Sequence, residues 1–565
     1  MWFDVIIRNG RILDGAGNPW FKSNIGIKHG TIKKIGSLNT GKASKTIDAK
    51  GLVVCPGFID IHNHSDFSML VDPKMESKVK QGVTTEVNGN CGGSPAPINE
   101  NVLNLRKLRQ ISEDEVDWTT MDGYFKRLEK QGISQNAITQ VGHGTVRYYV
   151  MGDAAKERTS SPSELEEMKL LVKEAMEDGA VGLSTGLDYA PGCYAHTDEL
   201  IELSKVVANY GGIYSSHLRE SSSKVLGWMG EQGSYLESVA EAIDIGRKSG
   251  VFAVQLSHIS GHWVFKHDTE MTNKVRSMID SAREEGINVT ADVLPSNWGS
   301  VAEWPGRSVF PPSYYANDEE KEKLFDKLSD PEERAKLKEE LMNKPISELG
   351  YENTAFRLLC IREGRGDSIK IFPPFNEHLK NQEYEYKTLD EIAQLKKKDL
   401  LDTLFDLLVE EDGKICVCHN IMDYDLVMSQ LTWPTTMPSS DGGSIEKPGK
   451  LAEKRVRPTA WAGFPMALEW VREEKLVTLE DMVRRMTSMP ARTLGLKDRG
   501  LIKKGFWADI TIIDPDTVKS NCTYENDCRP EFPIGIPYVI VNGQLVIEES
   551  EHTGILPGKV LRHPF

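Results

Sequence analysis

Eight apolar runs with the composition of β-strands recur between residues 53 and 441, and segments with helical periodicity lie between most of them. Strands that alternate with helices predict βα units and a parallel sheet, and eight such units predict an α/β fold closed into a (β/α)8 barrel of the TIM type. The helical segments include residues 162–178, 197–210, 235–249 and 273–285. The strand-like runs are residues 53–64, 84–91, 137–144, 180–186, 212–219, 252–260, 288–295 and 435–441.

The two ends of the chain carry a different pattern of short runs that alternate with period two. Near the N-terminus such runs are separated by Asn9-Gly10 and His29-Gly30, and near the C-terminus Asn542-Gly543 separates two more, which is typical of hairpins. We expect both ends to pair in one sheet domain. The predicted domains are a small β-sandwich from residues 1–55 and 497–565 and a barrel from residues 56–496.

A gap of roughly 140 residues between the seventh and eighth runs breaks the rhythm of the barrel. We predict that residues 298–398 form an insertion that covers the barrel mouth. The charged stretch at residues 319–340 is more typical of a solvated helical face than of a binding arm.

Polar side chains end the strand-like runs, and the active site of such a barrel lies at the carboxyl ends of its strands. His62 and His64 end the first run. Because they are two residues apart on a strand, they point to the same side and can face one metal ion. The other polar side chains at run ends are Cys91, His143, His217, His258, Asp292 and Asp441.

Thiolate and imidazole ligands together favour zinc over magnesium or calcium. A carboxylate beside the metal can take a proton from the attacking water and return it to a leaving amine, a role that suits Asp441. We therefore predict a zinc site at the barrel mouth, with Asp441 as the catalytic residue. The predicted metal ligands are His62, His64, Cys91, His217, His258 and Asp441.

Other motifs allow competing interpretations. Cys416-Val417-Cys418-His419 contains metal-ligating residue types, but strand alternation directs the two cysteines and the histidine to opposite faces and favours core packing. Residues 182–186 only loosely resemble the nucleophile elbow of serine hydrolases. His143 either lines the pocket or has a supporting role. The sequence has no glycine-rich phosphate loop followed by Lys and Ser or Thr, which argues against nucleotide hydrolysis.

The net charge of −16 argues against affinity for nucleic acid or an anionic membrane, because phosphate binding depends on clustered Lys and Arg. The sequence shows no signal-like N-terminus and no apolar run of membrane-spanning length. Eight cysteines are too sparse for a disulfide framework, although Cys522 and Cys528 could close a loop in a secreted protein. We expect a cytoplasmic protein with a small-molecule substrate and no nucleic-acid or membrane partner, and the sequence leaves a homo-oligomer open.

Nine short motifs are spread over nearly the whole chain, at residues 10–15, 57–64, 89–93, 142–145, 182–187, 216–220, 440–443, 486–492 and 505–510. Together they resemble the D-aminoacylase (N-acyl-D-amino-acid deacylase) branch of the amidohydrolase superfamily. The resemblance implies that Cys91, His217 and His258 hold one zinc ion tightly, with the cysteine in place of the carboxylated lysine of hydantoinases. It also implies a second, weaker metal position that involves His62, His64 and Asp441.

The substrate-binding positions of that family differ in this chain. Family members carry a lysine and a Tyr-Pro-Tyr segment that hold the substrate carboxylate, and this chain has Ser260 and Leu294-Pro295-Ser296 there. A His-Pro pair of the family becomes Arg457-Pro458. We expect altered substrate recognition, in which amides that lack a free α-carboxylate are better substrates than N-acetyl-D-amino acids. The candidates for a substitute anchor are Arg219, Arg365 and Arg457.

The leading hypothesis is a zinc-dependent hydrolase of the C–N bond in an N-acylated amine or amino-acid derivative. A cyclic amide or imide hydrolase is the alternative, because it would use the same polarised carbonyl. A non-catalytic scaffold with the same fold is disfavoured, since scaffolds commonly lose metal ligands and this chain keeps a full set.

Overall fold

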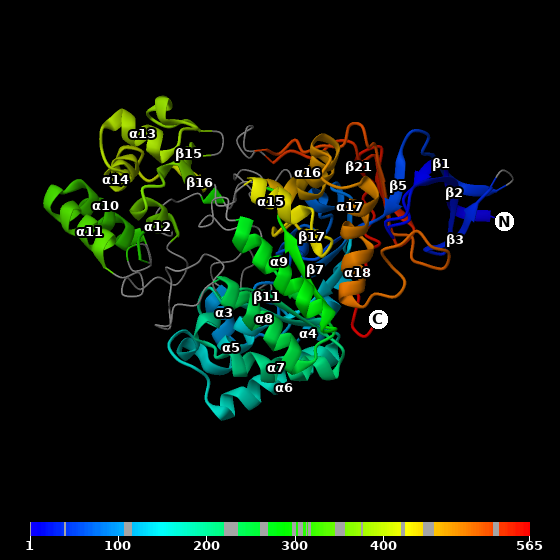
Figure 1. Ribbon diagram of the computed structural model, residues 1–565, viewed down its shortest axis with the longest axis horizontal. Helices are drawn as coiled ribbons and strands as arrows, with labels where there is room; N and C mark the ends of the chain where they lie inside the picture. The colour runs from blue at the N-terminus through cyan, green and yellow to red at the C-terminus, as the bar shows by residue number, and fades with distance from the viewer. Residues whose placement is uncertain are drawn as a thin grey trace.

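In the computed structural model, eight parallel strands form the predicted barrel (Figure 1). The third strand passes from β8 in one sheet to β9 in the next, and the backbone N–H of Asp441 donates to the carbonyl of His62 at 3.0 Å, which joins the last strand to the first. The strands are β6 (Phe58–Asp60), β7 (Val83–Asn88), β8 (Asn136–Thr139) with β9 (Val141–Gly142), β10 (Gly182–Gly186), β11 (Ile213–His217), β12 (Val254–Leu256), β13 (Val289–Val293) and β17 (Thr436–Pro438). The structure describes residues 2–38, 41–106, 116–219, 235–259, 269–296, 301–302, 309–311, 314, 318–344, 356–374, 377–419, 424–444, 457–523 and 530–565.

Helices surround the strands and share a large buried core with them. The helix α6 begins at Pro162 because the side chain of Ser161 accepts the N–H of Glu164 in a capping box, and it ends at Gly179, whose φ is +110°. The four helical segments expected from the sequence are confirmed as α6 to α9. The helices around the barrel are α1 (Ser68–Val71), α2 (Glu76–Val79), α3 (Glu100–Arg106), α4 (Met121–Gln131), α5 (His143–Met151), α6 (Pro162–Asp178), α7 (Thr197–Asn209), α8 (Tyr235–Ser249), α9 (Thr269–Glu284), α15 (Tyr424–Leu431), α16 (Pro458–Glu474), α17 (Leu479–Met486) and α18 (Ser488–Leu494).

Both ends of the chain contribute to a nine-stranded sheet beside the barrel. The turn Asn542-Gly543 joins two of its strands as predicted, with φ of +49° and +80°. The interpretation of Asn9-Gly10 as a hairpin turn is wrong, because β1 continues through both residues. Asn9 adopts φ +61° at a register shift, which asparagine tolerates, so the strand bulges instead of reversing. The strands are β1 (Trp2–Ile12), β2 (Phe21–Lys28), β3 (Thr31–Gly36), β4 (Lys42–Asp48), β5 (Val53–Pro56), β18 (Ile510–Ile513), β19 (Tyr538–Val541), β20 (Gln544–Glu548) and β21 (Glu551–His552).

The described residues from 301 to 419, between β13 and β17, form a unit with its own core, drawn at the end of the molecule opposite β1 to β3 (Figure 1). That core extends from Val309 to Val417, so the unit continues past Lys398. Cys416 and Cys418 are buried on its central strand, which supports the core-packing interpretation of that motif. The elements are β14 (Val301–Ala302), α10 (Asp318–Ser329), α11 (Pro331–Asn343), α12 (Phe356–Arg362), β15 (Ile369–Phe372), α13 (Leu389–Lys396), α14 (Leu400–Glu410) and β16 (Cys416–His419).

The last ten residues leave the sheet domain and run along the barrel. Val560 forms a parallel bridge with Ala137 of β8, and the N–H of Leu561 donates to the carbonyl of the same alanine. Leu561 and Phe565 pack against apolar side chains such as Ile138 and Ile213 on the barrel strands. The C-terminus therefore packs against the barrel as well as contributing to the sheet domain.

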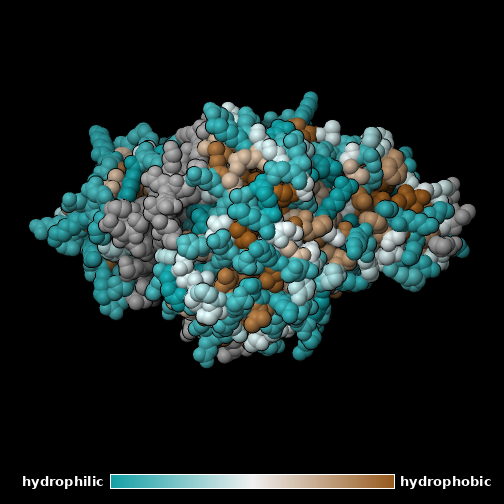
Figure 2. Space-filling view, turned by 60° about the horizontal axis from the view of Figure 1, so that its bottom comes forward, coloured by the Kyte–Doolittle hydropathy of each residue, from teal (hydrophilic) through white to brown (hydrophobic). Residues whose placement is uncertain are grey.

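The surface is mainly hydrophilic on the face drawn in Figure 2, with more hydrophobic residues toward the end that carries β1 to β3. Trp2 and Trp20 are among the exposed large apolar side chains and both lie near the N-terminus. Within the described part of the chain, none of the helices combines the length and apolar character needed to cross a membrane.

Candidate metal centre

Two clusters of metal-ligating side chains meet at the carboxyl ends of the barrel strands. One consists of Cys91, His217 and His258, the other of His62, His64 and Cys91, and within each cluster the ligand atoms lie within 4.8 Å of one another. The six predicted site residues therefore come together, because Asp441 also reaches the second cluster. Its Oδ1 lies 3.0 Å from His64 Nε2 and 3.5 Å from His62 Nε2.

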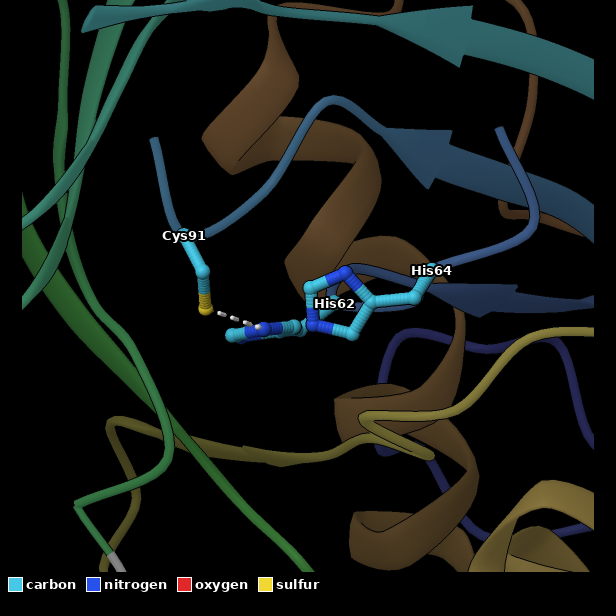
Figure 3. Close-up of side chains that lie close together, drawn as sticks. All are labelled: His62, His64 and Cys91. Carbon is cyan, nitrogen blue, oxygen red and sulfur yellow. Dashed lines mark hydrogen bonds between the residues drawn. The ribbon is translucent and has the colours of Figure 1, made fainter. Parts of the chain in front are cut away.

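Cys91 belongs to both clusters. Its Sγ is 3.3 Å from His62 Nε2 and 3.6 Å from His258 Nε2. In Figure 3 the thiol points at the ring of His62, and His64 lies beside that ring from a neighbouring stretch of backbone. A tetrahedral zinc ion places a sulfur and a nitrogen ligand about 3.5 Å apart. The Cys91 and His258 spacing therefore fits zinc, as does the soft thiolate and imidazole donor set.

Three of these residues have left-handed backbone conformations. The φ angles are +53° for Cys91, +33° for His258 and +42° for Asp441. Such conformations are costly for residues other than glycine and persist where the surroundings enforce them, which is common at functional sites. The strands end just before these residues, so each side chain turns toward the centre of the barrel mouth.

The charges in the cluster favour a thiolate at Cys91. Burial alone would raise the pKa of this thiol, but the charge on His62 and hydrogen bonds from His217 and His258 hold the pKa well below its ordinary value. For His217, burial opposes protonation, but hydrogen bonds to Asp188 and Cys91 raise its pKa to about 10. A metal cation can bind to such a thiolate and its neighbouring imidazoles by displacing the protons of the imidazoles.

Asp441 is held from two sides. Its Oδ1 faces the histidines. On the other side, Nη1 of Arg457 donates to Oδ2 of Asp441 and, at 2.7 Å, to the backbone carbonyl of Asp441. Burial opposes the charged form of Asp441, but Arg457 and then His64 keep its pKa well below the usual range. The carboxylate is thus ionised and oriented with one oxygen toward His62 and His64.

Beneath Asp441, a fully buried lysine holds the loop that carries it. Lys78 donates from Nζ to the hydroxyl of Ser440 and to the carbonyl of Gly442, and it lies 3.2 Å from the Asp60 carboxylate. Asp60 also accepts the backbone N–H of Ser440. These contacts connect the strand of His62 to the loop of Asp441.

Sequence reasoning did not identify Lys78, Asp188 or Tyr189. The Tyr189 hydroxyl donates to the carbonyl of Cys91 at 2.8 Å and its ring packs edge-on against His217, while Asp188 Oδ2 lies 3.7 Å from His217 Nε2. Asp188 and Tyr189 follow the fourth strand-like run after one intervening residue, so the strand-end argument that pointed to the predicted ligands could have pointed to them as well. A lysine on a short helix gives no comparable signal.

The other residues that the sequence singled out lie apart from the six predicted site residues or support them. His143 is buried and binds Glu199 at 2.7 Å, which favours the supporting role. Arg219 is paired with Glu241, and Arg365 binds Ser368 in the inserted unit. Of these three arginines, only Arg457 contacts one of the six predicted site residues among the described contacts. Leu294 and Ser296 are buried. Ser260 and Cys528 lie outside the described residues.

Comparison with known proteins agrees with this geometry. The Amidohydrolase family model matches residues 45–275 and 453–547. N-acyl-D-glutamate deacylase and D-aminoacylase, both of Alcaligenes xylosoxydans xylosoxydans, are 30% and 29% identical to the chain, each over 99% of it and over 96% and 97% of their own lengths.

Solved structures give the same result. The crystal structure of N-acyl-D-glutamate deacylase from Bordetella bronchiseptica, complexed with zinc and a phosphonate inhibitor, superposes with a TM-score of 0.74 at 29% identity over all of both chains. A D-aminoacylase structure concerned with its binuclear metal centre gives 0.73 at 27% identity, over 99% of this chain and all of that one. The chain therefore belongs to the amidohydrolase family, in the group that contains N-acyl-D-glutamate deacylase and D-aminoacylase.

Proposed function

We propose that this chain hydrolyses the amide bond of an N-acyl-D-amino acid derivative, with a zinc ion bound by Cys91, His217 and His258. The observation that carries the proposal is the Cys-His-His cluster at the ends of three parallel strands, in a chain similar over its full length to deacylases. A second and weaker zinc position on His62, His64 and Asp441 is supported by their mutual distances.

When bound, zinc supplies a Lewis acid that polarises the amide carbonyl and activates the attacking water. Asp441 accepts the proton of that water on Oδ1, the oxygen that faces the ligand cluster, and donates it to the departing nitrogen. Arg457 restrains the other oxygen, so the carboxylate does not need to reorient between the two transfers. His64 is the most exposed of the six site residues, with 39% of its side chain accessible, and it marks the side from which a substrate approaches.

Substrate recognition differs from that of the relatives. Arg219 is engaged by Glu241, and the guanidinium of Arg457 is engaged by Asp441, so neither is presented as an open anchor for a substrate carboxylate. At the altered segment, Leu294 is apolar and buried in the barrel core, so it supplies no charged group for a substrate carboxylate. We therefore expect that the favoured substrates lack a free α-carboxylate. The inserted unit, which leaves the barrel at the carboxyl end of β13, is proposed to contribute to the mouth.

The test compares kcat/KM for an N-acyl-D-amino acid, its neutral carboxamide, the L-enantiomers and a cyclic imide on zinc-loaded enzyme. We expect turnover of the D-configured acyclic amides, with the carboxamide preferred over the acid. A tenfold preference for the free acid, about 1.4 kcal/mol in transition-state binding, would show that another residue binds the carboxylate. Turnover of the cyclic imide alone would favour the alternative function.

We propose a cytoplasmic location, which is supported by the free thiols of Cys55, Cys91, Cys193, Cys360 and Cys418. The negative net charge supports a neutral or mildly polar substrate.

A further inference from the structure

Asp292 is a fully buried carboxylate at the end of β13 that accepts hydrogen bonds from three strands. Its Oδ1 accepts the backbone N–H of His258 at 3.0 Å and the hydroxyl of Ser439 at 2.7 Å. Its Oδ2 accepts the side-chain amide of Gln255 at 3.0 Å and lies 3.3 Å from Nδ1 of His62. Two donors on each oxygen use the full accepting capacity of a carboxylate.

This arrangement fixes which nitrogen of His62 carries the proton. An ionised carboxylate only accepts hydrogen bonds, so the ring of His62 keeps its proton on Nδ1, and Nε2 is the nitrogen that gives up its proton to a metal ion. Nε2 is the nitrogen that lies 3.3 Å from Cys91 Sγ and 3.5 Å from Asp441 Oδ1. The nitrogen directed at the ligand cluster is thus the one that can bind a metal.

The same carboxylate also supports the first ligand cluster. His258 has a left-handed backbone, with φ of +33°, and its N–H is fixed by Asp292. Ser439, which donates to the same oxygen, lies two residues before Asp441 on the segment that follows β17. One buried side chain therefore contacts segments that hold ligands of both clusters.

We propose that Asp292 is a positioning residue shared by the two metal positions, which sets the tautomer of His62 and holds the backbone of His258. The inference rests on the proposed function, because it assumes that the clusters bind zinc. Carboxylates that orient a ligating histidine typically change metal affinity by 10- to 100-fold when they are replaced.

The first experiment titrates zinc into metal-free wild type, Asp292→Asn and the control Ser439→Ala against a competing chelator. Asp292→Asn replaces one accepting oxygen by an NH2 donor, which favours the wrong tautomer of His62. We expect the second zinc equivalent to bind about 10- to 100-fold more weakly, with a smaller loss for the first. Ser439→Ala removes one donor but keeps the carboxylate, so its zinc affinities should stay within about threefold of wild type.

The second experiment reads the wild type directly and uses a variant only to assign one signal. Histidine labelled with nitrogen-15 in zinc-loaded wild type reports by NMR which ring nitrogen carries hydrogen, and comparison with His62→Asn identifies the signal of His62. We expect the hydrogen on Nδ1. Hydrogen on Nε2, or equal zinc affinities in wild type and Asp292→Asn, would overturn the inference. Wild type that binds no zinc would contradict the proposed function instead.

Discussion

Replacing Lys78 by methionine tests whether the buried ion cluster holds the loop of Asp441. Lys78 Nζ contacts the carboxylates of Asp60 at 3.2 Å and Glu86 at 3.6 Å, and all three side chains are fully buried. Removing one partner of such a cluster leaves uncompensated buried charge and costs about 3–5 kcal/mol. Burial raises the pKa of Glu86 to about 7, so this group can take up a proton and the loss should lie near the lower end of that range.

The assay is hydrogen exchange followed by mass spectrometry, because it localises the loss in a chain with several cores. A loss of about 3 kcal/mol corresponds to exchange that is about 10²-fold faster. We expect this acceleration in peptides that cover residues 58–64 and 436–444, the two segments that the cluster connects. The exposed Lys74 is the matched control, and Lys74→Met should stay within about 0.5 kcal/mol.

The peptides and variants in which exchange becomes faster decide whether the buried ion cluster holds the loop of Asp441. Unchanged exchange in both peptides for Lys78→Met would refute the role of the cluster. An equal effect of the two lysine variants would show that the change does not come from the buried charge of Lys78.

Further expectations concern the catalytic group, acid stability and metal uptake. Asp441→Asn should lower kcat by about 10²–10⁴-fold and keep the first zinc ion, and near-normal turnover would exclude its role in proton transfer. Burial opposes the charged form of Glu199, but His143 and Arg147 lower its pKa to about 2, and Ser160 also donates to it. Its ionised form therefore stabilises the fold above about pH 4.5, and this contribution, at most about 3 kcal/mol, is lost as the pH falls toward 2. The variant Glu199→Gln should lose less stability than wild type between pH 5 and 3. In the metal-free enzyme His217 and His64 are protonated, because their pKa values are about 10 and about 9. Zinc must displace these protons, so the affinity for zinc should rise from pH 6 to 8. A zinc affinity measured by calorimetry that does not change over this range would contradict the expectation.

The barrel and the clustering of the candidate ligands could be predicted because their signals are local. Runs of apolar residues that end in Cys91, His217 or His258 indicate a strand, its carboxyl end and a candidate ligand at once. The helix α6 is equally local, since its capping serine and terminal glycine are adjacent to it in sequence.

Other features depend on contacts between distant parts of the chain. Lys78 and Ser440 are 362 residues apart, and the role of Asp292 becomes visible only when His62 and Gln255 lie beside it. The bulge at Asn9 looked like a turn because Asn-Gly favours left-handed conformations in either setting. Strand pairing decides between the two, and pairing is not encoded in the dipeptide.

Zinc content is the most direct test of the central claim that Cys91, His217 and His258 form the tight metal site. Elemental analysis of purified wild type should find one to two zinc ions per chain, and Cys91→Ala, His217→Ala and His258→Ala should each lose the tightly bound ion. Cys193→Ala, which changes a buried free cysteine outside the clusters, should keep it. Full zinc retention in all three ligand variants, or wild type without zinc, would contradict the account.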